Sequence, residues 1–214
     1  MRLFKTKAAA AALIAFAVAS CARQGDIMQS GILTVYTACP PVAIAAPTGD
    51  ITLFDPANSR DSAAIDVVAQ ITNLRGTCDE TGTYIVTNAT FEVQARRRDN
   101  RGNRQVILPY YASVVQGGSN VVAKRLSRVA LNFADGQYTA TTTGAATTQV
   151  LRSAATLPED IRREITRERR AGDPRAAVDP LSDPAVRAAV ERARFEVLVG
   201  FDLTEEQLRY NATR

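Results

Sequence analysis

The stretch IDVVAQITNLRGTCDETGTYIVTNATFEVQA, residues 65–95, decides the fold. Apolar residues recur at every second position in two runs, which a turn at Asp79–Gly82 separates. A period of two puts the apolar side chains of each run on one face, which is typical of paired, half-buried strands. These faces comprise Ile65, Val67, Ala69 and Ile71 in the first run and Ile85, Thr87, Ala89, Phe91, Val93 and Ala95 in the second.

Other runs of the chain alternate in the same way, and turn-forming residues separate them. Asp135-Gly136 is a strong hairpin signal, and Asn58–Ser62 is expected to be another turn. Pro109 lacks an amide hydrogen, so we expect its strand to lie at a sheet edge or to carry a bulge. A bulge is also expected near Lys124–Ser127, where the alternation loses phase. The expected strands are Ile32–Thr37, Ile51–Phe54, Gln105–Val115, Val121–Phe133, Gln137–Thr148 and Phe195–Phe201, with a short apolar piece at Val42–Ala46.

Three helical segments are expected toward the C-terminus. The segment Thr156–Glu159 fits a capping box, which begins a helix that runs to about Arg170. A second helix begins at Pro184, and a third follows Thr204, which opens another capping box. About seven strands with hairpin spacing predict an all-β fold. We expect an immunoglobulin-like antiparallel β-sandwich with a helical insertion at 151–194, before the last strand, and a short C-terminal helix.

The first 20 residues have the composition of a secretory signal peptide. A basic segment, Met1–Lys7, precedes an apolar run, Ala8–Ala19, which is too short to span a bilayer. The run ends in Val18-Ala19-Ser20-Cys21, which resembles the lipobox of bacterial lipoproteins. That resemblance implies diacylglycerol on the Cys21 thiol, cleavage before Cys21 and acylation of the new amine. The alternative is ordinary cleavage after Ala19, which leaves Cys21 as a free thiol.

The lipoprotein resemblance also implies a location. In the enterobacterial pattern of the family, an aspartate after the cysteine retains the protein in the inner membrane, whereas here Ala22 follows. We therefore expect a cell-envelope protein that faces the periplasm and is anchored by covalent lipid, in the outer membrane rather than the inner one. Its expected segments are a signal peptide (1–20), a lipidated tether (21–31) and the β-sandwich domain (32–214).

Two further cysteines, Cys39 and Cys78, remain if lipid occupies Cys21. An even pair in an exported protein favours a disulfide, which closes a loop of about 40 residues and contributes roughly 4 kcal/mol by chain entropy. The alternative is a pair of buried free thiols. The chain has no Cys-x-x-Cys motif, so the sequence gives no sign of a redox role.

The mature region also resembles uncharacterised lipoproteins of alphaproteobacteria. The shared feature is an aromatic-rich last strand followed by an "LTxxQLxYN" segment, which here begins at Leu203 and ends at Asn211. This resemblance implies no known activity.

The sequence lacks the residues and motifs that are usual in several classes of catalytic, metal-binding and phosphate-binding sites. The chain has no histidine, which is the commonest general base and metal ligand, and no nucleophile elbow or phosphate-binding loop. We therefore expect no cofactor, catalytic residue or metal site. The formal charge of +4 falls to +1 without residues 1–20, so global charge does not favour nucleic acid as a partner. Three carboxylate pairs are expected at a turn and two helix starts: Asp79-Glu80, Glu159-Asp160 and Glu205-Glu206.

One turn is rich in arginine. Five arginines surround a single acid, Asp99, in the segment 96–104. Guanidinium groups bind phosphate and carboxylate bidentately, so this is a candidate anion-binding loop for lipid A, teichoic-like polymers, peptidoglycan acids or an acidic protein partner. The alternative is a solvated loop that keeps a sheet edge soluble. The five residues are Arg96, Arg97, Arg98, Arg101 and Arg104.

These features favour a non-catalytic binding or assembly module of the cell envelope. Edge strands of such a sandwich accept partner strands, and Pro109 marks the candidate edge. The insertion at 151–194 is a second candidate partner surface. The alternatives are an envelope hydrolase that uses paired carboxylates and a structural spacer tethered to the membrane.

Overall fold

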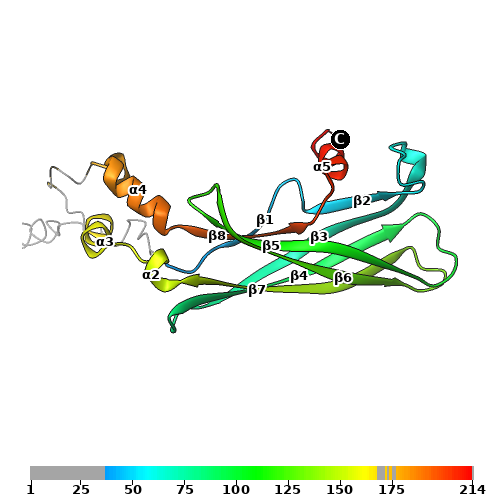
Figure 1. Cartoon of the computed structure of the whole chain (residues 1–214), viewed down its shortest axis with the longest axis horizontal. Helices are drawn as coiled ribbons and strands as arrows, with labels where there is room; N and C mark the ends of the chain where they lie inside the picture. Colours follow the sequence, from blue (N-terminus) through cyan, green and yellow to red (C-terminus); the bar gives the residue numbers. More distant parts are fainter. Residues whose placement is uncertain (1–36, 168–171, 173, 175–176, 214) are drawn as a thin grey trace, which may run out of the picture. The chain divides into compact units, whose positions relative to one another are not determined.

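The computed structural model describes residues 37–167, 172, 174 and 177–213 (Figure 1). The predicted signal peptide and tether, and the predicted strand at Ile32–Thr37 except for its last residue, lie outside the described residues. The sandwich described below belongs to one compact unit, residues 36–165 and 180–214.

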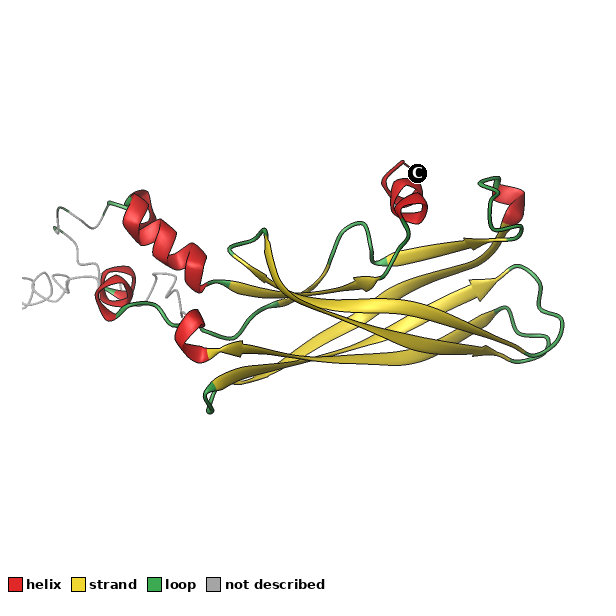
Figure 2. Ribbon diagram, in the orientation of Figure 1, coloured by secondary structure: helices red, strands yellow, loops and turns green. Residues whose placement is uncertain are grey.

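Eight strands of the described chain form two four-stranded sheets (Figure 2). In the first sheet β1 pairs in parallel with β8, and all other pairs in both sheets are antiparallel. The predicted all-β sandwich is therefore confirmed, with one parallel pair in addition. The first sheet has the order β1 (Val42–Ile44), β8 (Phe195–Phe201), β5 (Arg104–Gln116) and β6 (Asn120–Phe133). The second has the order β2 (Asp50–Phe54), β3 (Ile65–Asp79), β4 (Tyr84–Arg97) and β7 (Thr139–Leu151).

The predicted central pair is β3 and β4, with Ile71 opposite Val93. Their register shifts between Thr72 and Arg75, where Asn73 has a φ of 50°. Asparagine tolerates this left-handed conformation better than most residues. The alternation therefore specifies the pairing, and a bulge interrupts it.

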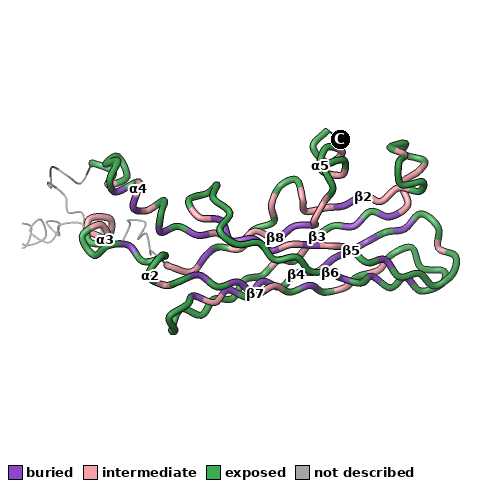
Figure 3. The backbone as a smooth tube through the Cα atoms, viewed as in Figure 1, coloured by how far each residue is buried: buried purple, intermediate pink, exposed green. Residues whose placement is uncertain are grey.

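The core lies between the inner faces of the two sheets, where buried positions recur along most of the long strands (Figure 3). Phe91 of β4 meets the Tyr110 ring of β5 edge to face, with ring centroids 5.1 Å apart. A Cβ atom on Gly144 of β7 would lie 2.3 Å from the Phe91 ring. Glycine at that position therefore lets the largest buried aromatic side chain of β4 fit under β7.

The predicted edge position of the Pro109 strand is wrong, although its pairing with β6 does carry a register irregularity. Its strand, β5, lies inside the first sheet between β8 and β6, and the β5 register shift falls at Val114/Val115. The β5–β8 pairing begins at Tyr110, and the Pro109 carbonyl accepts a hydrogen bond from the Asp202 amide just beyond β8. The missing amide hydrogen thus faces the point where β8 has ended, and the sheet loses little by it.

Short helices occupy the predicted insertion. The first predicted helix is α3 (Glu159–Thr166), which ends before Arg170, and the second is α4 (Pro184–Ala193), which begins where predicted. Asp183 caps α4, because its Oδ1 accepts from the Ala185 amide at 2.7 Å. The remaining short elements are η3 (Ser62–Ala64), α2 (Arg152–Ala155) and η4 (Pro180–Ser182).

The C-terminal helix α5 (Glu205–Thr213) has the predicted capping box. The Thr204 amide donates to Gln207 Oε1 at 2.9 Å, and the Gln207 amide donates to Thr204 Oγ1 at 3.3 Å. This reciprocal pair fixes the start of the helix, and the Tyr210 ring of α5 lies edge to face against the Phe54 ring of β2.

Candidate functional site

Arg97, one of the five predicted anion-binding residues, is not on an exposed loop. It is the last inward-facing position of the β4 alternation and is 1% exposed. Its guanidinium donates four hydrogen bonds to main-chain carbonyls of two different loops. The acceptors are Gly102 and Asn100 in the β4–β5 loop, at 2.9 and 2.7 Å, and Gln137 and Ala134 in the β6–β7 loop, at 2.8 and 2.9 Å. Arg97 therefore joins two loops.

The other side of the Arg97 guanidinium lies against Phe133. The distance from the guanidinium carbon to the ring centroid is 5.3 Å, which is within the range of a cation–π contact. The carbonyls and the ring together replace the water that a buried cation loses. This explains how a charged residue occupies the end of the core.

Two more of the five arginines form ion pairs within the chain. Arg104 makes a two-pronged contact with Asp66, at 2.7 and 2.5 Å, and the hydrogen bond from Arg104 lowers the pKa of Asp66. Arg101 contacts Asp99 at 2.6 Å and lowers the pKa of that carboxyl well below its usual range. Both guanidinium groups are therefore shared with acids of the same end of the sandwich.

The last two arginines differ. The Arg98 side chain donates to the Ala63 carbonyl, whereas the Arg96 side chain is exposed and has no hydrogen-bond or ion-pair partner among the described residues. The structure thus gives four of the five guanidinium groups an internal role. Anion binding by this loop stays a prediction.

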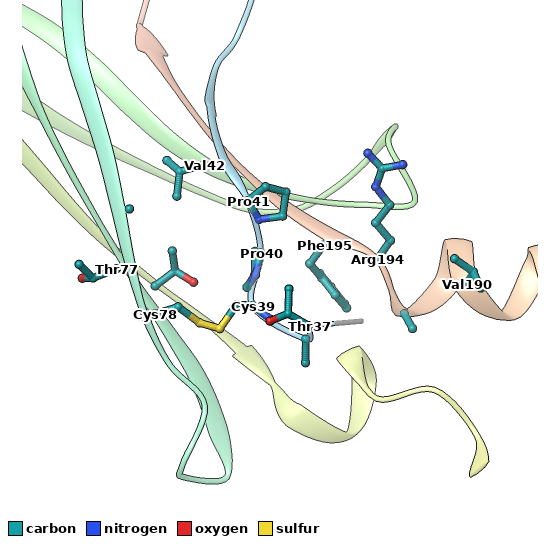
Figure 4. Close-up of a pocket in the computed structure, with 14 residues that line it drawn as sticks. Thr37, Cys39, Pro40, Pro41, Val42, Thr77, Cys78, Val190, Arg194 and Phe195 are labelled. Carbon is teal, nitrogen blue, oxygen red and sulfur yellow. A yellow bond between two sulfur atoms is a disulfide. The ribbon is translucent and has the colours of Figure 1, made fainter. Parts of the chain in front are cut away.

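At the opposite end, Cys39 and Cys78 form the predicted disulfide, which joins the segment before β1 to the end of β3. Beside it lies a cavity of about 610 Å³ (Figure 4). Its walls are mainly apolar and include Pro40, Pro41 and Phe195. Thr87 also lines it, and the buried Oγ1 atom of Thr87 has no hydrogen-bond partner. The cavity has the size of a small-ligand pocket, and its lining suits an apolar group.

The predicted carboxylate pairs are spread over three elements. Asp79 accepts hydrogen bonds from Thr81, which lower its pKa, and Glu159 of α3 pairs with Arg162 and Arg163. On α5, Glu205 pairs with Arg209 and Glu206 with Arg60. Among the described residues, no group of three or more histidine, cysteine or acidic side chains is arranged to hold a metal ion.

The outer strands of the two sheets differ in how their edges are protected. β1 has three residues and β2 has five. The β2 edge is covered by α5, because Asn211 Nδ2 donates to the Asp50 carbonyl at 2.8 Å and to the Pro47 carbonyl at 3.0 Å. The long β7 edge is capped near its middle, where the Tyr110 hydroxyl donates to the Ala145 carbonyl at 2.7 Å. Short length and side-chain caps are both ways of blocking an edge.

The fourth outer strand, β6, is long and lacks such a cap. It pairs with β5 alone, and within the described part of the chain no side chain hydrogen-bonds to its backbone. Residues 120–128 are exposed on both faces of the strand. We call residues 120–128 of β6 the open edge. The sequence signal was the lost alternation near Lys124–Ser127, which predicted a bulge, whereas the actual register shift lies beside Val122.

Comparisons with known proteins identify no relative: no family model, curated protein or solved structure matches this chain. In the residues that the structure describes, no helix has the length and apolar character needed to cross a membrane.

Proposed function

We propose that this chain is a lipid-anchored protein of the cell envelope whose β-sandwich is a non-catalytic binding or assembly module. The Val18–Cys21 segment supports a covalent lipid on Cys21, and Ala22 favours the outer membrane over the inner one. The module faces the periplasm, where its partner is an envelope protein or an anionic envelope polymer. The membrane is contacted through the lipid.

The observation that carries the binding role is the open edge of β6. A strand edge presents a row of peptide N–H and C=O groups, and an extended segment of another protein can pair with it. β1, β2 and β7 are short or capped, so β6 is where the described sandwich offers this row. The open edge replaces Pro109 as the expected docking position.

Two alternatives have weaker support. An envelope hydrolase needs two carboxylates across one bond, but the described pairs lie on three separate elements, and Glu159, Glu205 and Glu206 form ion pairs with arginines. A spacer would need no open edge. If the protein is a binding module, blocking the β6 edge should remove a partner. If it is a spacer, blocking this edge should change no contact.

The anchor is tested on the protein purified from its native membrane. We expect the N-terminal fragment to begin at Cys21 and to carry the mass of acyl chains, and the protein to partition into the detergent phase. Cys21→Ser should move it to the aqueous phase. Native protein without acyl mass would contradict the proposed anchor and location.

The binding role is tested with a photo-reactive residue at position 128 in cells. A specific partner should be crosslinked by this protein and lost when Leu126→Pro is added, because proline blocks the neighbouring edge position. Leu126→Ala is the matched control and should retain the crosslink. An unchanged crosslinking pattern in all three proteins would favour the spacer.

A further inference from the structure

We propose that the open edge of β6 takes an acidic extended segment of a partner protein as an added strand. This inference rests on the proposed binding function and names the chemistry of its partner. The argument uses the direction of the peptide groups, the exposure of the side chains and the distribution of charge.

The hydrogen bonds of β5 determine which β6 peptide groups face outward. The Asp202 amide donates to the Pro109 carbonyl and the Gly117 amide to the Arg194 carbonyl, so the odd-numbered peptide groups of β5 face β8. The even-numbered ones therefore face β6, where Tyr110 lies opposite Ser127 and Ala112 opposite Arg125. It follows that Ser127 and Arg125 direct their peptide groups to β5.

The intervening residues of β6 direct their peptide groups away from β5. These are Lys124, Leu126 and Arg128, and their N–H and C=O groups lie along the open edge. The same rule applied to β2 and β7 turns the capped carbonyls of Asp50 and Ala145 outward as well. On β2 and β7, side chains therefore hydrogen-bond to outward-facing backbone carbonyls, whereas on β6 such carbonyls remain available.

The inner face of β6 is also incompletely covered. Arg125 lies opposite Ala112, which is 3% exposed, and so projects from the inner face of the sheet, yet Arg125 itself is exposed. On β7, the inward-facing Ala146 is only partly buried. A strand added beside β6 would extend the first sheet by about 4.8 Å and would cover side chains that now contact water.

The charges of the open edge select an acidic partner. The segment carries Lys124, Arg125 and Arg128, and the whole of β6 contains no acidic residue. Lys124 pairs with Asp202 at 2.9 Å, but Arg125 and Arg128 have no ion-pair partner among the described residues. On the outer face, Leu126 lies between Lys124 and Arg128. The complementary strand therefore has an apolar residue with an acid two positions away on each side.

A second copy of this chain fits the edge less well. Its β6 would bring three more cations and no carboxylate to within one strand spacing. Like charges on neighbouring strands are destabilising. The charge of the edge therefore favours a different, acidic protein.

The test uses full-length protein in detergent micelles and two synthetic peptides of about nine residues, the length of the open edge. One peptide places Glu two positions away on each side of Val, with Thr at the positions between them, and the other has Lys in place of each Glu. Fluorescence anisotropy measures affinity, and amide hydrogen exchange locates the bound peptide. We expect the Glu peptide to bind at least about tenfold more tightly than the Lys peptide. It should protect the amides of Lys124, Leu126 and Arg128.

Variants separate the edge from its charge. Leu126→Pro should lower the affinity for the Glu peptide by about tenfold, since it removes an outward N–H without removing a hydrogen bond to β5. Leu126→Ala should lower this affinity by less than about threefold. Arg125→Glu with Arg128→Glu should reverse the preference between the peptides. Arg209→Glu, which changes an exposed arginine on α5, is the matched control and should leave both affinities unchanged.

Each other outcome has a defined meaning. Equal affinity for both peptides with protection at the open edge would overturn the acidic preference while leaving strand addition in place. If no peptide protects these amides at about 1 mM, both the acidic strand and the proposed docking site fail. Self-association that Leu126→Pro abolishes, without peptide binding, would identify a second copy as the occupant and overturn the acidic partner.

Discussion

The two ends of the sandwich are closed by different chemistry. At one end the disulfide Cys39–Cys78 joins the segment before β1 to β3 by a covalent bond. At the other, Arg97 joins two loops through four hydrogen bonds to carbonyls. The disulfide acts largely by restricting the unfolded chain, whereas Arg97 acts only in the folded state, where its partners have lost other donors. The comparison shows that one domain can stabilise its two ends in different ways: one crosslink destabilises the unfolded state, and the other stabilises the folded state.

Arg97→Met should have the largest effect on stability. Four buried carbonyls would lose their donor, each at a cost of roughly 1–3 kcal/mol before relaxation, so we expect the free energy of unfolding to fall by about 5 kcal/mol. Urea denaturation measures this loss. Arg97→Lys keeps the charge but not the planar, forked guanidinium group, so its free energy of unfolding should lie between those of Arg97→Met and the wild type. A small loss in Arg97→Met would mean that the loops hold without the guanidinium.

Removing the disulfide should have the next largest effect. The sequence separation of 39 residues predicts a loss of about 4 kcal/mol for Cys39→Ser with Cys78→Ser. Hydrogen exchange sharpens the comparison, because this variant should loosen β1 and the end of β3, and Arg97→Met should loosen residues 98–103 and 134–138. The same amides opening in both variants would contradict the separation of the two ends.

Arg104→Gln should have a smaller effect, about 1 kcal/mol, because its ion pair with Asp66 is partly exposed to solvent. The pKa of Asp66 is lowered in the folded protein, so its stabilisation is present above the unfolded value of about 4 and is lost as the pH falls through the folded value. Arg104→Gln should reduce this acid sensitivity. NMR titration should show the Asp66 pKa rising toward its ordinary value, and an unchanged pKa would argue against the pair.

Arg96→Ser should have the smallest effect, below about 0.5 kcal/mol, because the side chain is exposed and has no described partner. Thermal unfolding beside the other arginine variants provides the measurement. Binding of anionic polymers to Arg96→Ser also tests what remains of the arginine-loop prediction. A destabilisation as large as that of Arg104→Gln would indicate a structural role for Arg96.

The sequence predicted the strands well where one face is continuously apolar. The alternation from Ile85 to Ala95 is local, and the helix starts at Pro184 and Thr204 depend on neighbouring residues. The disulfide followed from a cysteine count. These features need no knowledge of which segments meet in space.

The candidate site depended on contacts that are distant in sequence. Arg97 lies two positions after Ala95 and continues the inward phase, but its charge suggested a turn, and the carbonyls that accept from it include residues about 40 positions away. The position of Pro109 within the sheet depended on where β8 ends. The open edge became recognisable only when the caps on β2 and β7 were known.

The disulfide also determines how the fold would carry mechanical load. The first described residue is Thr37, and two residues later the disulfide joins Cys39 to Cys78 of β3, a long strand inside the second sheet. A pull on the preceding segment would therefore pass through the sulfur–sulfur bond into β3. The three-residue strand β1, which could otherwise peel from β8, lies behind the crosslink and would be shielded from the force.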